Sequence, residues 1–167
     1  AGFIANFMGM IQVGTNGSGS ERGLYTSEKF FQNYANWLRA DAYLAVIYVS
    51  DEEDQSPQAI EHYVQVLQAL KDNPAKVKAH SIVDTINRGA SSGGLTVGSA
   101  RYQAVSNATG GSIKEITSNF GAALDDIAEQ IVNLTQSFAL SAAPVVESIA
   151  VTVDGVDNSD WSYDAAT

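Results

Sequence analysis

Carboxylate and hydroxyl side chains are concentrated in two polar segments that could bind a metal ion. One is the run Asp51-Glu52-Glu53-Asp54, which directly follows a stretch of apolar residues. The other is the Gly-rich segment from Val13 to Gly23, which contains the hydroxyl residues Thr15 and Ser18. Mg²⁺, Ca²⁺ and Mn²⁺ prefer hard oxygen ligands of these types. A shell that the protein fills only in part leaves a position for the carboxylate of a partner.

The acidic run also has a plain structural interpretation. Acidic residues are common in solvated loops, and Asp51 would favour the start of a following helix through the helix dipole. On residue types alone we favour this solvated loop over a metal site. The formal net charge of −10 does not separate the two interpretations, because acidity suits both a divalent cation and an ordinary surface.

The sequence lacks the usual catalytic and nucleotide-binding patterns. The Gly-rich segment contains neither Gly-Lys-Ser/Thr nor Gly-x-Gly-x-x-Gly, the fingerprints of phosphate-binding loops. His62 and His80 form no catalytic pattern with a serine or a carboxylate, and cysteine is absent. We therefore expect a protein that is not an enzyme. The acidic balance also argues against nucleic acid as a partner, because it would repel a phosphate backbone.

Apolar patterns predict strands in three places. Residues 43–49 form a continuous, β-branched apolar run, which is typical of a strand covered on both faces of a parallel sheet. Residues 77–83 predict a second strand of the same length. Near the end of the chain, apolar residues alternate at 149, 151 and 153, and Asp154-Gly155 then predicts a turn. No apolar run is long enough to predict a membrane span.

Helical spacing of apolar residues separates these strands. It occurs over residues 24–38, 57–71 and 118–138. Ser56 is a suitable capping residue for the second of these helices, and Pro57 suits its first position. Strand and helix therefore alternate over most of the chain.

This alternation predicts an α/β fold with helices on both faces of a mostly parallel sheet. Residues 1–142 would form the main domain, and residues 143–167 would be a linker with the first strands of a following β module. In α/β folds, ligands collect at the carboxyl ends of strands. Asp51 follows the end of the first predicted strand, where such a ligand would bind.

The same two segments resemble parts of a von Willebrand factor type A (VWA) domain of the bacterial kind. The run from Tyr43 to Pro57 resembles the strand that ends in an aspartate of the family's metal-ion-dependent adhesion site (MIDAS). The segment from Gly14 to Leu24 is similar to the loop that carries the hydroxyl ligand of that site. Tyr102 with Thr109-Gly110-Gly111, and the last helix from Asn119, are similar to the closing segments of the family. The resemblance covers residues 1–142.

The resemblance implies a doubly wound, Rossmann-like sheet and a divalent cation, Mg²⁺, Ca²⁺ or Mn²⁺. It assigns the metal-binding aspartate to Asp51 and the hydroxyl ligand to Ser18, with Thr15 as the rival and Asp54 as an outer acceptor. The family also supplies an Asp-x-Ser-x-Ser loop, which this chain does not contain. We therefore expect an N-terminally incomplete domain whose first strand comes from another segment or chain.

The function implied by the resemblance is non-enzymatic protein–protein binding in adhesion or scaffolding. The partner would be another protein that offers an acidic side chain, or the missing part of the domain, or neighbouring subunits. The alternative is a structural subunit of a cell-surface assembly or a virion, in which the metal site is incomplete or silent. The expected location is extracellular or at the cell surface, and the alternative location is a virion.

Overall fold

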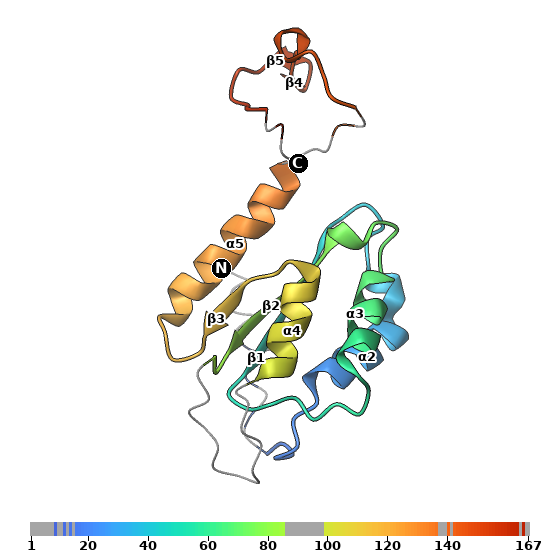
Figure 1. Ribbon diagram of the computed structural model, residues 1–167, viewed down its shortest axis with the longest axis vertical. Helices are drawn as coiled ribbons and strands as arrows, with labels where there is room; N and C mark the ends of the chain where they lie inside the picture. The colour runs from blue at the N-terminus through green and yellow to red at the C-terminus, as the bar shows by residue number, and fades with distance from the viewer. Residues whose placement is uncertain are drawn as a thin grey trace.

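The centre of the fold is a parallel sheet. The computed structural model describes residues 9, 12, 14, 16–85, 99–136, 140, 142–163 and 165. The three-stranded sheet has the order β1-β2-β3 (Figure 1). Its strands are β1 (Leu44–Ser50), β2 (Val77–Val83) and β3 (Ile113–Glu115). The strand predictions over residues 43–49 and 77–83 are confirmed, as is the α/β class.

Helices follow and precede the strands in the alternation that the sequence predicts. The α-helices are α2 (Gly23–Tyr34), α3 (Ile60–Gln68), α4 (Ala100–Thr109) and α5 (Phe120–Gln136), and short 3-10 helices are η1 (Ala35–Trp37), η2 (Pro74–Lys76) and η3 (Val146–Ser148). None of the helices within the described residues combines the length and the apolar character needed to cross a membrane.

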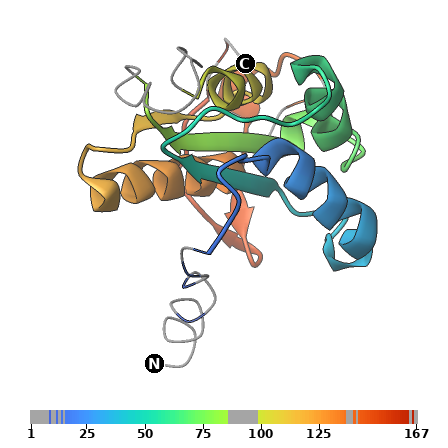
Figure 2. The ribbon, with the colours of Figure 1, turned by 90° about the horizontal axis from the view of Figure 1, so that it is seen from below.

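Alternating side chains of β2 divide the core between the two faces of the sheet. Val77, Ala79 and Val83 belong to the larger cluster, which includes buried side chains of α2, α3 and α4. Ile82 points to the other face and packs against Ala123 and Ile127 of α5. Side chains of α2, α3 and α4 therefore cover one face of the sheet, and those of α5 cover the other. Figures 1 and 2 show α4 and α5 on opposite sides of the strands.

The turn after α4 lies against the backbone of the central strand. Thr109 Oγ1 accepts a hydrogen bond from Ala79 N at 2.9 Å, and Gly111 N donates to Ser106 O at 2.8 Å. A Cβ atom at Gly111 would lie 1.9 Å from Ala79 O. This position therefore accepts only glycine, because any side chain would overlap the strand.

A small hairpin follows the main fold. β4 (Thr152–Val153) pairs antiparallel with β5 (Val156–Asp157). The turn residues Asp154 and Gly155 have φ angles of 52° and 80°, which matches the predicted Asp-Gly turn. Both strands are exposed along their length, so the hairpin contributes little to the core.

His80 is a buried titratable group on the α5 face of β2. It is 1% exposed, and its Nδ1 accepts a hydrogen bond from Ser112 N at 3.1 Å. The ring proton therefore sits on Nε2, which has no hydrogen-bond partner within the described residues. Burial, helped by the nearby charge of Lys78, lowers the pKa of His80 below its ordinary value of 6.5.

This lowered pKa predicts a loss of stability in mild acid. The unfolded chain takes up the proton first, so the free energy of unfolding falls as the pH drops below the ordinary value of 6.5. We expect His80→Asn, whose amide oxygen can still accept from Ser112 N, to flatten this pH dependence between about pH 7.5 and about pH 5.5 in urea unfolding. The wild-type chain unfolded over the same pH range is the reference. An unchanged slope in His80→Asn would contradict the assignment.

Candidate functional site

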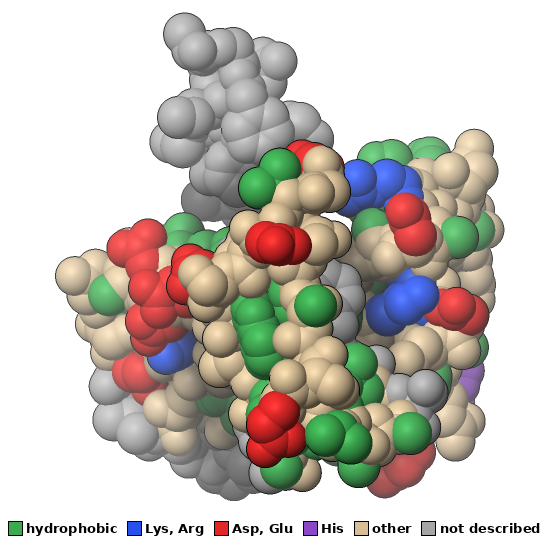
Figure 3. Space-filling model, turned by 90° about the horizontal axis from the view of Figure 1, so that it is seen from above, with side chains coloured by type: hydrophobic (Ala, Val, Ile, Leu, Met, Phe, Trp, Pro, Cys, Tyr) green, Lys and Arg blue, Asp and Glu red, His purple; other side chains and the backbone are tan. Residues whose placement is uncertain are grey.

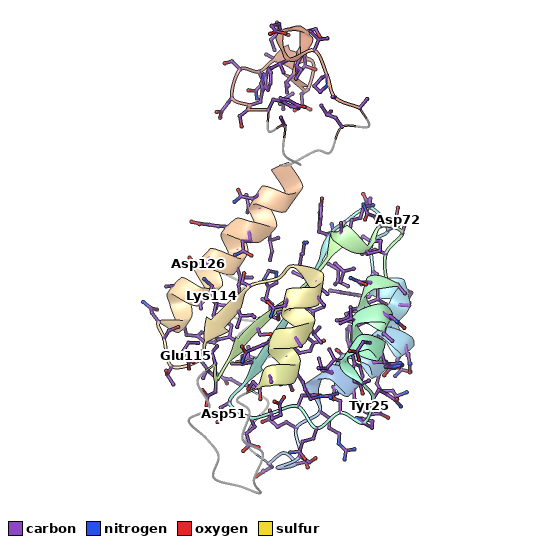
Figure 4. The ribbon with its side chains drawn as sticks, in the orientation of Figure 1. Tyr25, Asp51, Asp72, Lys114, Glu115 and Asp126 are labelled. Carbon is purple, nitrogen blue, oxygen red and sulfur yellow. The ribbon has the colours of Figure 1, made fainter. Side chains whose placement is uncertain are left out.

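Carboxylates lie at or directly after the ends of all three parallel strands, at the same edge of the sheet. The register pairs Ser50 with Val83 and Val83 with Glu115, so Asp51, Asp84 and Glu115 lie at neighbouring strand ends. Figure 4 shows Asp51 and Glu115 at this end of the molecule. Asp84 is buried, whereas Asp51 is exposed. The prediction that Asp51 lies at a carboxyl strand end is confirmed.

The Gly-rich loop is held directly beside the acidic loop. Ser50 Oγ donates a hydrogen bond to Glu21 Oε2, and Gln55 N donates to Glu21 O at 2.7 Å. Ser20 Oγ donates to Gln55 Oε1 at 2.9 Å. The two polar segments that the sequence separates by about thirty residues therefore form one surface.

Two of the three residues predicted to bind metal, Ser18 and Asp51, belong to the segments that form this surface. Ser18 is exposed, and its Oγ accepts a hydrogen bond from Ser20 N at 3.1 Å. The Asp51 carboxylate makes no hydrogen bond within the described residues, so it is open to a ligand from solvent. Thr15 lies outside the described residues. In the described part of the chain, no three or more His, Cys, Asp or Glu side chains form a group that could hold a metal ion.

Asp54 is a structural carboxylate rather than an open acceptor. It is 2% exposed, and its two oxygens accept from Leu24 N at 3.1 Å, Ser56 N at 3.0 Å, Ser56 Oγ at 2.8 Å and Arg101 Nε at 3.1 Å. These bonds join the N-terminus of α2, the acidic loop and α4. Donors of the protein itself therefore occupy both oxygens of Asp54, which the predicted role as an outer acceptor would need.

Ser56 caps a different helix from the one predicted. Its Oγ accepts a hydrogen bond from Tyr25 N at 2.9 Å, in the first turn of α2, while α3 begins only at Ile60. The predicted helix start at Pro57 is therefore wrong. The reason is tertiary: α2 has no side-chain cap of its own, and Asp54 and Ser56 supply its capping acceptors.

Glu53 caps the N-terminus of α4 in the same way. Its carboxylate accepts hydrogen bonds from Ala100 N at 2.8 Å and from Arg101 N at 3.0 Å. A negative charge at a helix N-terminus is stabilised by the free amides and the helix dipole. Two of the four acidic residues in the run, Glu53 and Asp54, are therefore used to organise the loop, and Asp51 is left facing solvent.

Two stacked tyrosines lie behind the loop. The rings of Tyr48 and Tyr102 are 5.1 Å apart, and Tyr102 Oη accepts a hydrogen bond from Gly23 N at 3.1 Å. Burial raises the pKa of Tyr48 to about 12 and raises that of Tyr102 further. Both phenols are therefore protonated at neutral pH, which makes them structural groups and poor general bases.

The residues that organise this surface were not predicted from the sequence. Glu21, Arg101 and Tyr102 act through partners that lie between 29 and 79 positions away in the chain. Local spacing carries no signal for such contacts. Glu53 lies within the recognised acidic run, but its role as a cap for a helix nearly fifty residues later depends on the fold.

Comparison with known proteins adds no further assignment. No family model matches the chain, and no curated protein or solved structure matches it either. The resemblance to a VWA domain therefore stays a prediction from the sequence.

Proposed function

We propose that this chain is a non-enzymatic protein-binding module of the VWA type, used in adhesion or scaffolding at a cell surface. Its contact surface would be the carboxyl edge of the sheet, where a divalent cation joins Asp51 to an acidic group of a partner protein. The observation that carries this proposal is the exposed Asp51 carboxylate, which has no hydrogen bond within the described residues and lies beside the Ser18–Glu21 loop.

The arrangement of ligands supports a weak, shared site. Mg²⁺ keeps several waters and uses one or two protein carboxylates, and a hydroxyl such as that of Ser18 can complete such a shell. A cation held this loosely has coordination positions free for a partner. We therefore expect a dissociation constant on the order of 10⁻⁴ to 10⁻³ M for the isolated chain.

We also propose that the three-stranded sheet is part of a larger, doubly wound sheet. The Asp-x-Ser-x-Ser loop of the family would then come from another segment or chain and would tighten cation binding. The carboxyl edge already has the polarity that such a site needs, since Glu21, Asp51 and Asp84 lie at it.

Calorimetric titration of Mg²⁺, Ca²⁺ and Mn²⁺ tests the proposal. We expect saturable binding to the wild-type chain, lost or weakened at least about tenfold in Asp51→Ala because the main charged ligand is removed. Asp125→Ala is the matched control, since Asp125 is an exposed carboxylate on α5. Equal weakening in both variants would mean non-specific attraction to an acidic surface, and no binding to the wild-type chain would overturn the proposal.

A structural subunit with a silent metal site is the second candidate. It is favoured by large apolar side chains that remain exposed along β1 and in η1 after α2, including Val49 at 53% and Trp37 at 69% exposure. Exposed apolar patches mark association surfaces. Partner binding that persists in a chelator and survives Asp51→Ala would favour this second candidate.

A further inference from the structure

The loop before α2 contains an asparagine that is followed directly by a glycine. Asn16 and Gly17 form the one Asn-Gly pair in the sequence, and both are exposed outside any helix or strand. A Cβ atom built on Gly17 would meet no atom within 4 Å, so this stretch is not packed against the fold. The loop is fixed to the carboxyl edge of the sheet only a few residues later, by Ser20 and Glu21.

An open Asn-Gly pair has the atoms for an intramolecular reaction. The backbone nitrogen of Gly17 can attack Asn16 Cγ if the chain adopts a conformation that brings the two atoms together. Glycine permits this conformation because it has no Cβ atom to restrict the backbone or to hinder the approach. Within the described residues, neither Asn16 nor Gly17 N makes a hydrogen bond that would hold the pair apart.

The other asparagines in the described part of the chain are protected by their surroundings or by the residue that follows. Asn33 lies in α2, and its Nδ2 donates to a main-chain oxygen one turn earlier at 2.8 Å. Asn73 precedes Pro74, which has no N–H group to attack. Asn158 Oδ1 accepts a hydrogen bond from a main-chain amide at 2.7 Å, and a serine follows it. The rest lie in or directly before helices: Asn36, Asn107, Asn119 and Asn133.

We propose that Asn16 is a site of spontaneous deamidation, which converts it to a mixture of aspartate and isoaspartate. The Gly17 nitrogen loses its proton to base and bonds to Asn16 Cγ, and the side-chain nitrogen leaves as ammonia. Water then opens the cyclic imide at one of its two carbonyls and breaks the bond of that carbonyl to the Gly17 nitrogen. Opening at Cγ gives aspartate, and opening at the main-chain carbonyl gives isoaspartate. One water is consumed and one ammonia is released, so no oxidant or enzyme is needed.

Deamidation would add a negative charge to the surface that is proposed to bind the cation. Both products carry a carboxylate at position 16, two residues before Ser18. Glu21 and Asp51 lie at the same edge of the sheet, whereas the opposite end of the molecule carries Lys and Arg side chains beside its acidic ones (Figure 3). A further carboxylate attracts a divalent cation and offers it another oxygen ligand. This consequence, unlike the deamidation itself, rests on the proposed function.

Incubation of the purified chain at physiological temperature, followed by trypsin digestion and fragment mass spectrometry, tests the deamidation. Trypsin releases residues 1–22 as one peptide, because Arg22 is the first basic residue of the chain. We expect progressive conversion at Asn16, faster in mildly alkaline than in neutral buffer because the attacking nitrogen must lose its proton. Asn158 is the internal reference and should stay intact. Conversion at Asn16 that is no faster than at Asn158 would overturn the proposal.

Gly17→Ala is the matched variant for the mechanism. The φ angle of Gly17 is not in the left-handed region and its Cβ position is open, so the substitution should keep the fold, as circular dichroism would verify. It should slow the conversion of Asn16 by at least about tenfold, because the added Cβ restricts the backbone. Equal rates in the wild-type chain and in Gly17→Ala would contradict the proposed attack by the Gly17 nitrogen.

The effect on the cation is measured separately from the deamidation. In the calorimetric titration with Mn²⁺, Asn16→Asp should bind about threefold or more tightly than Asn16→Gln, which has the same size of side chain within one methylene but no charge. Equal affinities would overturn the predicted effect on cation binding. A wild-type chain that binds no cation would overturn the proposed function, while the mass spectra would still decide whether Asn16 deamidates.

Discussion

Gly111→Ala is expected to lower the free energy of unfolding by about 4 kcal/mol or more, or to prevent folding. A Cβ atom there would lie 1.9 Å from Ala79 O and 2.6 Å from Ala79 C, which are backbone atoms of the central strand. Rotation of a side chain cannot relieve such an overlap. The turn after α4 must move away from β2, and the bonds from Ala79 N to Thr109 Oγ1 and from Ser81 N to Ser112 O would then weaken.

Urea unfolding followed by circular dichroism measures this effect. Gly19→Ala is the matched control, because a Cβ at Gly19 would meet no atom within 4 Å. We expect that control to stay within about 0.5 kcal/mol of the wild-type chain. Similar stabilities for Gly111→Ala and Gly19→Ala would show that the turn does not lie as closely on β2 as described.

Asp54→Ala is expected to lower the free energy of unfolding by about 2 to 4 kcal/mol, because it leaves two amides and one hydroxyl without their buried acceptor and removes the carboxylate partner of the partly exposed Arg101. The lost partners are Arg101 Nε, Leu24 N and both polar atoms of Ser56. Asp54→Asn should have a smaller effect, since its amide keeps one acceptor oxygen. These substitutions act on the junction of α2, α4 and the acidic loop.

Asp51→Ala is the informative comparison for Asp54→Ala in the same unfolding experiment. Asp51 is exposed and makes no hydrogen bond within the described residues, so its removal should change the stability by less than about 0.5 kcal/mol. Asp51 would then act on cation binding, and Asp54 on folding. A large loss of stability in Asp51→Ala, or none in Asp54→Ala, would reverse this division.

Local patterns in the sequence predict the strands and the last helix well. β1 and β2 are continuous apolar runs, and α5 has regular apolar spacing, so burial alone defines them. The turn at Asp154 and Gly155 is predicted because positive φ angles favour those residue types. The start of α3 is mispredicted because the hydroxyl of Ser56 binds Tyr25 N of α2 rather than its own helix.

In the candidate site, too, local patterns predict the position of a residue, whereas contacts between distant segments are not predicted. Asp51 was placed at a strand end because it follows an apolar run, which is a local signal. The contact of Glu21 with Ser50, and that of Glu53 with the first amides of α4, join segments far apart in the chain. Such contacts follow from how α2 and α4 pack on the sheet, and no spacing rule predicts them. The sequence thus predicts that Asp51 lies at the carboxyl edge of the sheet, but it does not predict which side chains organise the loop.

The most direct test of the proposed cation site is the paramagnetic broadening of backbone amide signals by substoichiometric Mn²⁺. Mn²⁺ broadens the signals of nearby nuclei, so it reports where the ion binds as well as whether it binds. We expect selective broadening at residues 18–21 and 50–53 in the wild-type chain and none there in Asp51→Ala. Broadening centred on Asp125 and Asp126 of α5, or equal at all exposed carboxylates, would contradict the proposal that the carboxyl edge of the sheet binds the cation.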